Sequence, residues 1–130
     1  MKFDELRKAY EAFNARDADA LVALAHPDVE IRPLVASVTS TAPWLGHDGL
    51  RRLVDDTSRH WHRFELRCDD QMDFGDRLVA FVRVSTQADA EAPVIEGDVA
   101  HLIELDDGLM RRFVAYRDRD DALRDAEASG

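Results

Sequence analysis

Four stretches in the second half of the chain have the length and composition of strands, and turn signals separate them. In the first stretch Phe64, Leu66 and Cys68 alternate with polar residues, and the later stretches cover residues 78–87, 94–105 and 109–117. Period-two alternation is typical of strands that bury one face and leave the other in water. The breaks are FGDR, ADAEAP and DDG. The last is a strong hairpin signal, because aspartate and glycine tolerate the positive φ angles of tight two-residue turns. The second half therefore predicts an antiparallel sheet of four strands joined by hairpins.

Three helices are expected ahead of this sheet. Apolar residues recur at helical spacing over about residues 2–15. Asp17 is placed to cap a second helix, and Pro27 is expected to end it because a proline nitrogen has no hydrogen to donate. A third helix is expected to begin near Asp48 and to carry an apolar face that extends to Trp61.

A strand and a loop are expected between the second and third helices. The strand covers residues 29–33, and residues 35–49 are rich in small and hydroxyl side chains. That composition favours a loop or short edge strand ending in a glycine turn, which would suit a lid. A short charged helix is expected from about Asp118. This order predicts a cone-shaped α+β fold, in which a strongly curved antiparallel or mixed sheet and three N-terminal-side helices enclose a cavity.

Length and charge restrict the possible partners. The 130 residues fit one domain over 1–130, and a composition of 45% hydrophobic and 34% charged residues is typical of a folded protein. The chain has 27 acidic and 17 basic residues, and its net charge of -10 would repel nucleic acids and anionic membranes. No run approaches the roughly 18 apolar residues of a membrane helix, and the single cysteine, Cys68, cannot form an internal disulfide. We therefore expect a cytoplasmic protein with no nucleic-acid or membrane partner.

Several stretches, taken in order, carry a resemblance to a known family. They are AYEAFNARDADALVALAHPDVEI, WLGHDGLRRLV, DFGDRLVAFVRV, HLIELDDGLMRRFVAYRD and a final DDAL. In this order they resemble the SnoaL-like polyketide cyclase and ketosteroid isomerase branch of the nuclear transport factor 2-like superfamily. The resemblance implies a conical fold, a mostly apolar cavity and a homodimer formed through the outer face of the sheet. It does not imply one activity, because this fold carries isomerases, cyclases, hydrolases, dehydratases and many non-enzymes.

His101 is the leading candidate for a functional residue. Its strand face also carries Gly97, Val99, Ile103 and Leu105, so the histidine interrupts an otherwise apolar row. A histidine in an apolar pocket can lose pKa by desolvation or gain it beside a carboxylate, and we expect it to titrate near neutrality and to transfer protons. The alternative is a core histidine bonded to the backbone. The resemblance aligns it with the aspartic acid that donates a hydrogen bond to the developing oxyanion in ketosteroid isomerases.

Other catalytic groups of the family are missing at the aligned positions. The isomerase tyrosine falls at Ala9, and Tyr10, one place along, is rotated by about 100° around the helix, which leaves its direction open. The isomerase base falls at Pro33, which cannot exchange a proton. The water-activating aspartate of limonene epoxide hydrolase falls at Ala115. These departures argue against a true ketosteroid isomerase.

Arg83 is the second catalytic candidate. It lies in a strand whose two faces are both apolar, so its direction is open. If Phe81 and Arg83 point inward, the guanidinium could bind a carboxylate or stabilise an enolate; otherwise Arg83 is a surface or interface residue. The resemblance favours the inward direction, because Arg83 matches the strand arginine of limonene epoxide hydrolase. Arg117, on the parity of Phe113 in the last strand, could lie at the cavity floor or pair with neighbouring aspartates.

The remaining candidates for lining the cavity are mostly aromatic. Trp44 and His47 flank the glycine that opens the third helix, at a corner that borders the cavity mouth in the family. The expected cavity residues are Tyr10, Trp44, His47, Phe64, Phe81, Val99, Phe113 and Arg117. The HWH sequence at 60–62 places its two histidines on opposite sides of a helix, with no third ligand at a recognisable spacing, so we expect no metal.

Two functions fit these residues. In the first, a cofactor-independent isomerase, cyclase or lyase acts on an apolar carbonyl compound, with His101 moving a proton and Arg83 stabilising the enolate. In the second, the cavity binds a ligand or is closed core, and the protein is a non-catalytic homodimeric module. The missing tyrosine and aspartate favour the second function, and the habits of the family favour the first.

Overall fold

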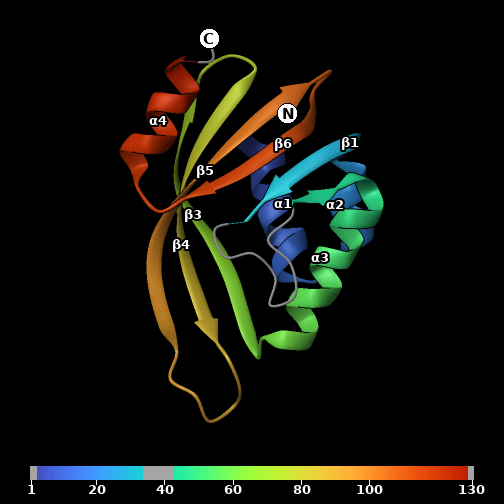
Figure 1. The fold of residues 1–130 in the computed structure, drawn as a ribbon, viewed down its shortest axis with the longest axis vertical. Helices are drawn as coiled ribbons and strands as arrows, with labels where there is room; N and C mark the ends of the chain where they lie inside the picture. Colours follow the sequence, from blue (N-terminus) through green and yellow to red (C-terminus); the bar gives the residue numbers. More distant parts are fainter. Residues whose placement is uncertain (1–2, 34–42, 129–130) are drawn as a thin grey trace.

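A computed structural model describes residues 3–33 and 43–128 of the chain (Figure 1). Its elements, in chain order, are α1 (Phe3–Asn14), α2 (Ala18–Ala23), β1 (Ala25–Arg32), β2 (Trp44–Leu45), α3 (Gly46–His60), β3 (Arg63–Asp73), β4 (Arg77–Gln87), β5 (Ile95–Asp106), β6 (Leu109–Tyr116) and α4 (Arg119–Ala128). Most of the predicted lid falls on residues 34–42, which lie outside the described residues; β2 and the start of α3 follow them.

The six strands form one curved, unclosed sheet in the order β2-β1-β6-β5-β4-β3. Neighbouring strands are antiparallel except β1 and β6, which are parallel. Figure 1 shows α1, α2 and α3 on one side of the sheet and α4 on the other. The predicted α+β class with three N-terminal-side helices is confirmed, and the sheet is mixed.

The turn between β5 and β6 has the predicted geometry. Asp107 has a φ of 53° and Gly108 a φ of 77°, so both central residues lie in the left-handed region that a tight two-residue hairpin requires. The predicted terminal helix is also present, as α4. The hairpin pattern of the second half is therefore confirmed.

Pro27 does not end the second helix, so that prediction is wrong. Helix α2 stops at Ala23, and Leu24 caps it by donating its backbone N–H to the carbonyls of Leu21 and Val22. Pro27 lies inside β1, where the pairing with β6 shifts register between Ala25 and Glu30. A proline is tolerated at such an irregularity because the missing N–H is not needed by the ladder. The predicted cap is present, since the Asp17 side chain accepts a hydrogen bond from the Ala20 N–H.

Two apolar clusters pack against the two faces of the sheet. The inner cluster joins α1, α2 and α3 to the sheet and includes the fully buried Leu6, Val29 and Leu78. The outer cluster lies beneath α4 and joins Val79, Phe81, Ala100, Leu102, Ala122 and Ala126. Because successive side chains of a strand point to opposite faces, the buried residues of β4 and β5 fall alternately into the inner and the outer cluster along most of their length. Within the described part of the chain, no helix combines the length and apolar character needed to cross a membrane.

Candidate functional site

An apolar cavity of about 390 Å³ lies between the inner face of the sheet and helices α1 and α3. Its volume falls within the range of small-molecule sites, roughly 300–1,000 Å³. Six aromatic side chains contribute to the wall: Tyr10, Phe13, Trp44, Trp61, Phe64 and Phe113. His101 lies in the same wall. The inner face thus encloses a mostly apolar space with few polar side chains in its wall.

Tyr10 and His101 form a hydrogen-bonded pair in this wall. The Tyr10 hydroxyl oxygen lies 2.7 Å from Nδ1 of His101, and the two rings stack at a centroid separation of 5.7 Å. Both residues are buried, with exposed fractions of 5% for Tyr10 and 4% for His101. Phe113 flanks the imidazole from β6, at a centroid distance of 4.5 Å.

The direction of Tyr10, left open by the sequence, is inward. Leu6, Ala9, Tyr10 and Phe13 all line the cavity from α1. They follow the i, i+3, i+4, i+7 spacing of a helix that buries a stripe more than 100° wide. A rotation of about 100° from Ala9 therefore keeps Tyr10 on the buried face. The helical spacing that predicted α1 already contained this signal.

Burial keeps both members of the pair uncharged. It lowers the pKa of His101 from 6.5 to about 3, because the apolar surroundings disfavour the imidazolium. Burial also raises the pKa of Tyr10 well above its usual value, and Cys68 adds a smaller effect in the same direction. The prediction that His101 titrates near neutrality is therefore wrong. At physiological pH the pair is suited to hydrogen bonding, and His101 is a weak base.

Three positions aligned with catalytic groups of the family lie in the cavity wall without an ionisable side chain. They are Ala9, Pro33 and Ala115, and Ala115 is the direct cross-strand neighbour of His101. A carboxylate that the sequence interpretation missed, Asp56 of α3, also contributes to the wall and lies 3.4 Å from Nε2 of His60. The available signal was its position three residues after Leu53, on the apolar face of α3.

Arg83 and Phe81 point away from the cavity, contrary to the inward direction that the resemblance favoured. Arg83 lies on the outer face, where its guanidinium pairs with Asp98 and Glu96 at 3.2 Å each. Hydrogen bonding to Asp98 is the main reason that the pKa of Arg83 is raised. Phe81 packs in the outer cluster, with the Arg119 guanidinium 4.6 Å from its ring centroid. Both faces of β4 are apolar because α4 covers part of the outer one, so alternation alone could not fix the direction.

Two further candidates lie outside the described lining. His47 Nε2 lies 3.0 Å from the Ala25 carbonyl and links the start of α3 to β1. Arg117 is exposed just past the end of β6. The other four predicted positions, Trp44, Phe64, Val99 and Phe113, contribute to the cavity wall.

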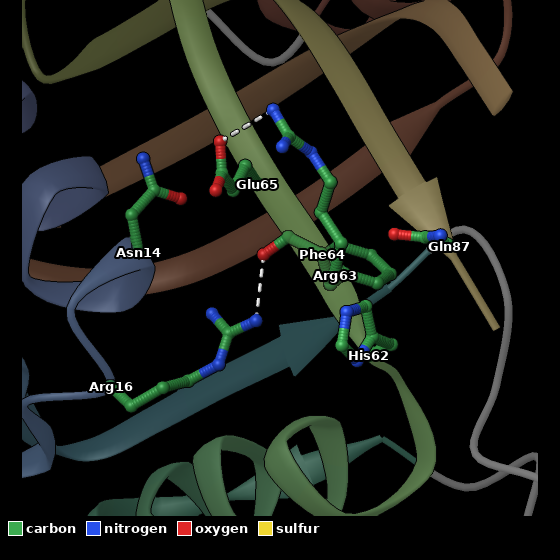
Figure 2. Close-up of a pocket in the computed structure, with 7 residues that line it drawn as sticks. All are labelled: Asn14, Arg16, His62, Arg63, Phe64, Glu65 and Gln87. Carbon is green, nitrogen blue, oxygen red and sulfur yellow. Dashed lines mark hydrogen bonds and ion pairs between the residues drawn. The ribbon is translucent and has the colours of Figure 1, made fainter. Parts of the chain in front are cut away.

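A second, polar pocket of about 330 Å³ opens where the end of α1 meets the edge strand β3 (Figure 2). Asn14 donates to the Leu66 carbonyl at 2.8 Å and accepts from the Leu66 N–H at 2.9 Å. Arg16 donates to the Phe64 carbonyl at 2.7 Å, and Arg63 pairs with Glu65 at 3.1 Å. The bonds of Asn14 and Arg16 join the end of α1 and the residues after it to the backbone of an edge strand, so these two side chains have a structural use.

The HWH sequence does not form a metal site in the described residues. His60 pairs with Asp56, and His62 lines the polar pocket. Across residues 3–33 and 43–128, no group of three or more histidine, cysteine, aspartate or glutamate side chains is arranged to hold a metal ion.

Solved structures similar to this chain share its fold. An NTF2-like protein of unknown function from Burkholderia pseudomallei is 21% identical, with a TM-score of 0.77 and 93% of each chain covered. TerC, co-crystallised with polyporic acid, is 20% identical, with a TM-score of 0.75 and coverage of 95% of this chain and 96% of TerC. Rv0760c from Mycobacterium tuberculosis, in complex with estradiol-17β-hemisuccinate, is 18% identical, with a TM-score of 0.70 and coverage of 90% of this chain and 93% of that one. A comparison with curated proteins finds no match.

A family model agrees with these structures. The model of the SnoaL-like domain matches residues 6–113, which include most of α1, most of β6 and every described cavity-lining residue except Ala115. That domain suggests small-molecule binding. The chain therefore belongs to the SnoaL-like domain family and has the NTF2-like fold.

Proposed function

We propose that the protein binds a small, uncharged and largely apolar molecule in the inner cavity, with His101 contacting its polar group. The observation that carries this proposal is the buried Tyr10–His101 pair, which provides a neutral hydrogen-bonding group in an apolar wall. An isolated polar contact of this kind orients an apolar ligand, because an unmatched polar atom would be costly there. The complexes of TerC and Rv0760c support small-molecule binding by proteins of this fold.

The charge of the wall favours an uncharged ligand. The described lining contains no lysine or arginine, and the low pKa of His101 keeps it neutral. Its two carboxylate residues already have partners, Asp56 with His60 and Glu96 with Arg83. An anionic ligand would enter an apolar space without a counter-ion, which costs several kcal/mol (roughly) even after relaxation.

Binding can be tested with Prodan, an uncharged naphthyl ketone whose fluorescence shifts to the blue in apolar surroundings. We expect a saturable blue shift with the wild-type protein. Ala115→Phe should abolish it by filling the space opposite His101, while Ala88→Phe, the same change on the exposed connection after β4, should leave it unchanged. Circular dichroism should show both variants folded. Absence of a saturable shift with the wild type would contradict the proposal.

Catalysis on a carbonyl compound is the second candidate, favoured by the presence of Asp56 and His101 in one cavity wall. Asp56 would take a proton from the carbon next to the carbonyl, and the electron pair of that C–H bond would form the enolate. A neutral donor in a dry site would then stabilise the enolate oxygen. Deuterium incorporation into the methyl group of 2-acetylnaphthalene in D₂O would detect this reaction. Incorporation should exceed the buffer rate and disappear in Asp56→Asn; incorporation at the buffer rate would exclude catalysis on this probe.

A homodimer through the outer sheet face completes the proposal. Helix α4 covers part of this face over β4, β5 and β6, so we expect the contact to use α4 or the uncovered charged surface, which includes the Arg112, Glu104 and Glu30 strip and the Arg83, Asp98 and Glu96 cluster. Sedimentation velocity should give a dimer at micromolar concentration. A monomer under those conditions would contradict it.

A further inference from the structure

We infer that Tyr10 fixes the tautomer of His101 and thereby makes the cavity select a ligand whose polar group accepts a hydrogen bond, such as a ketone, over the matching alcohol. This specificity rests on the proposed function, because it concerns the polar contact of a ligand in the same cavity. It assigns Tyr10 a positioning role that acts through the imidazole.

The first step concerns the proton between the two rings. The 2.7 Å separation of the Tyr10 hydroxyl from Nδ1 is a strong hydrogen bond, and one of the two atoms must donate. If Nδ1 carried the proton, the Tyr10 O–H would need another acceptor. Tyr10 is 5% exposed, and among the described residues its hydrogen-bond partner is His101. When the Tyr10 O–H donates to Nδ1, the hydroxyl proton is paired, and the one donor left over is the Nε2–H of a residue in the cavity wall, where a ligand can accept from it. This arrangement is therefore favoured.

The second step concerns the opposite side of the imidazole. A neutral histidine has one N–H and one lone pair, so an Nδ1 that accepts from Tyr10 places the proton on Nε2. A charged ring with two N–H groups is excluded near neutral pH, because burial lowers the pKa of His101 to about 3. His101 therefore offers the cavity a single neutral donor.

The third step concerns the ligand atom that meets this donor. A ketone oxygen accepts from Nε2–H and brings no proton of its own. An alcohol oxygen can also accept, but its O–H must then find an acceptor near Phe113 and the cross-strand alanines, Ala80 and Ala115. These side chains are apolar, so an alcohol proton directed at them is unpaired, and we expect the alcohol to bind more weakly than the ketone.

A matched pair of probes tests the selectivity. 2-Acetylnaphthalene and 1-(2-naphthyl)ethanol share a skeleton and differ in the ketone or alcohol at one carbon. Their dissociation constants can be measured by displacement of Prodan. We expect the wild type to prefer the ketone by about tenfold, the ratio that one unpaired buried donor produces. Equal binding of the two probes would overturn the inference while leaving the proposed binding function intact.

Tyr10→Phe separates the tautomer effect from simple packing. It keeps the aromatic ring but frees Nδ1, so either tautomer can form and the preference should fall below about threefold. Tyr116→Phe is the matched control, because it also removes a hydroxyl that donates a hydrogen bond, to Asp125, but from the outer side. It should keep the tenfold preference. A preference unchanged in Tyr10→Phe would overturn the inference.

Nitrogen-15 NMR of the imidazole gives a readout that does not need a ligand. The His101 signals, assigned by their absence in His101→Phe, should show a protonated Nε2 and a bare Nδ1 in the wild type. Tyr10→Phe should shift them toward a mixture of tautomers. A wild-type ring protonated at Nδ1 would overturn the inference, even if neither probe binds and the binding proposal has failed on its own.

Discussion

The two faces of the central strands carry polar side chains in different charge states. On the inner face His101 is buried, neutral and bonded to one neutral partner, Tyr10. On the outer face Arg83 keeps its charge, pairs with Asp98 and Glu96, and has 36% of its side chain exposed. The comparison shows that a fully buried imidazole is held in its uncharged form, whereas a solvent-exposed guanidinium keeps its charge beside carboxylate partners.

The faces also differ in packing, and this gives the largest expected effect. Leu102 is buried beneath α4 in a closed cluster, whereas Leu53 is half-buried and borders the cavity. Leu102→Ala should lower the free energy of unfolding by about 3 kcal/mol, because it opens a new void. Leu53→Ala should cost about 1 kcal/mol, because it enlarges a space that already exists. Urea unfolding measures both; equal losses would remove the distinction between a filled and a hollow face.

The neutral state of His101 predicts a pH dependence of intermediate size. The unfolded chain binds a proton at His101 near pH 6.5, but the folded protein does so only near pH 3. Between these values protonation favours the unfolded state, so stability falls as the pH falls below 6.5. From pH 6.5 to pH 5 the loss should be about 2 kcal/mol.

His101→Phe isolates this contribution, because both proteins keep the other histidines. The free energy of unfolding, measured by urea titration at several pH values, should fall less steeply below pH 6.5 in His101→Phe than in the wild type. The lost Tyr10 hydrogen bond shifts stability equally across this range, so the slope alone reports the titration. Identical slopes would show that the folded protein binds a proton at His101 as readily as the unfolded chain does, and they would remove the contrast between the faces.

The smallest effect belongs to the outer face. Arg83→Ala should change the free energy of unfolding less than either leucine variant or the loss of the His101 titration, because solvent-exposed ion pairs contribute little. It should leave the affinity for Prodan within about twofold, because the guanidinium points away from the cavity. A large loss of affinity in a displacement assay would return Arg83 to the ligand site and break the comparison.

The inner strand faces were predictable where one parity was clearly apolar. The row from Gly97 to Leu105 indicated which way β5 faces, and Val99 and His101 do line the cavity. The helical spacing of α1 also placed Tyr10 on the buried face with Leu6 and Phe13. The alignment of the isomerase tyrosine with Ala9 considered only the rotation between two neighbouring positions and so left the direction of Tyr10 open. In β4 the same reasoning failed, because α4 packs on the outer face and that face is therefore apolar as well. Both faces of the strand then look apolar in the sequence, and the direction of Arg83 cannot be read from alternation.

The sequence by itself determined the order of helices and strands, the DDG turn and the buried face of β5. These features depend on side-chain periodicity and on backbone angles within a few residues. Only the tertiary structure decided that Tyr10 meets Nδ1 of His101 from 91 positions away and that burial holds the imidazole neutral. A hydrogen bond between distant residues and a desolvated ring both depend on what packs around them, and no local pattern of the chain encodes those neighbours.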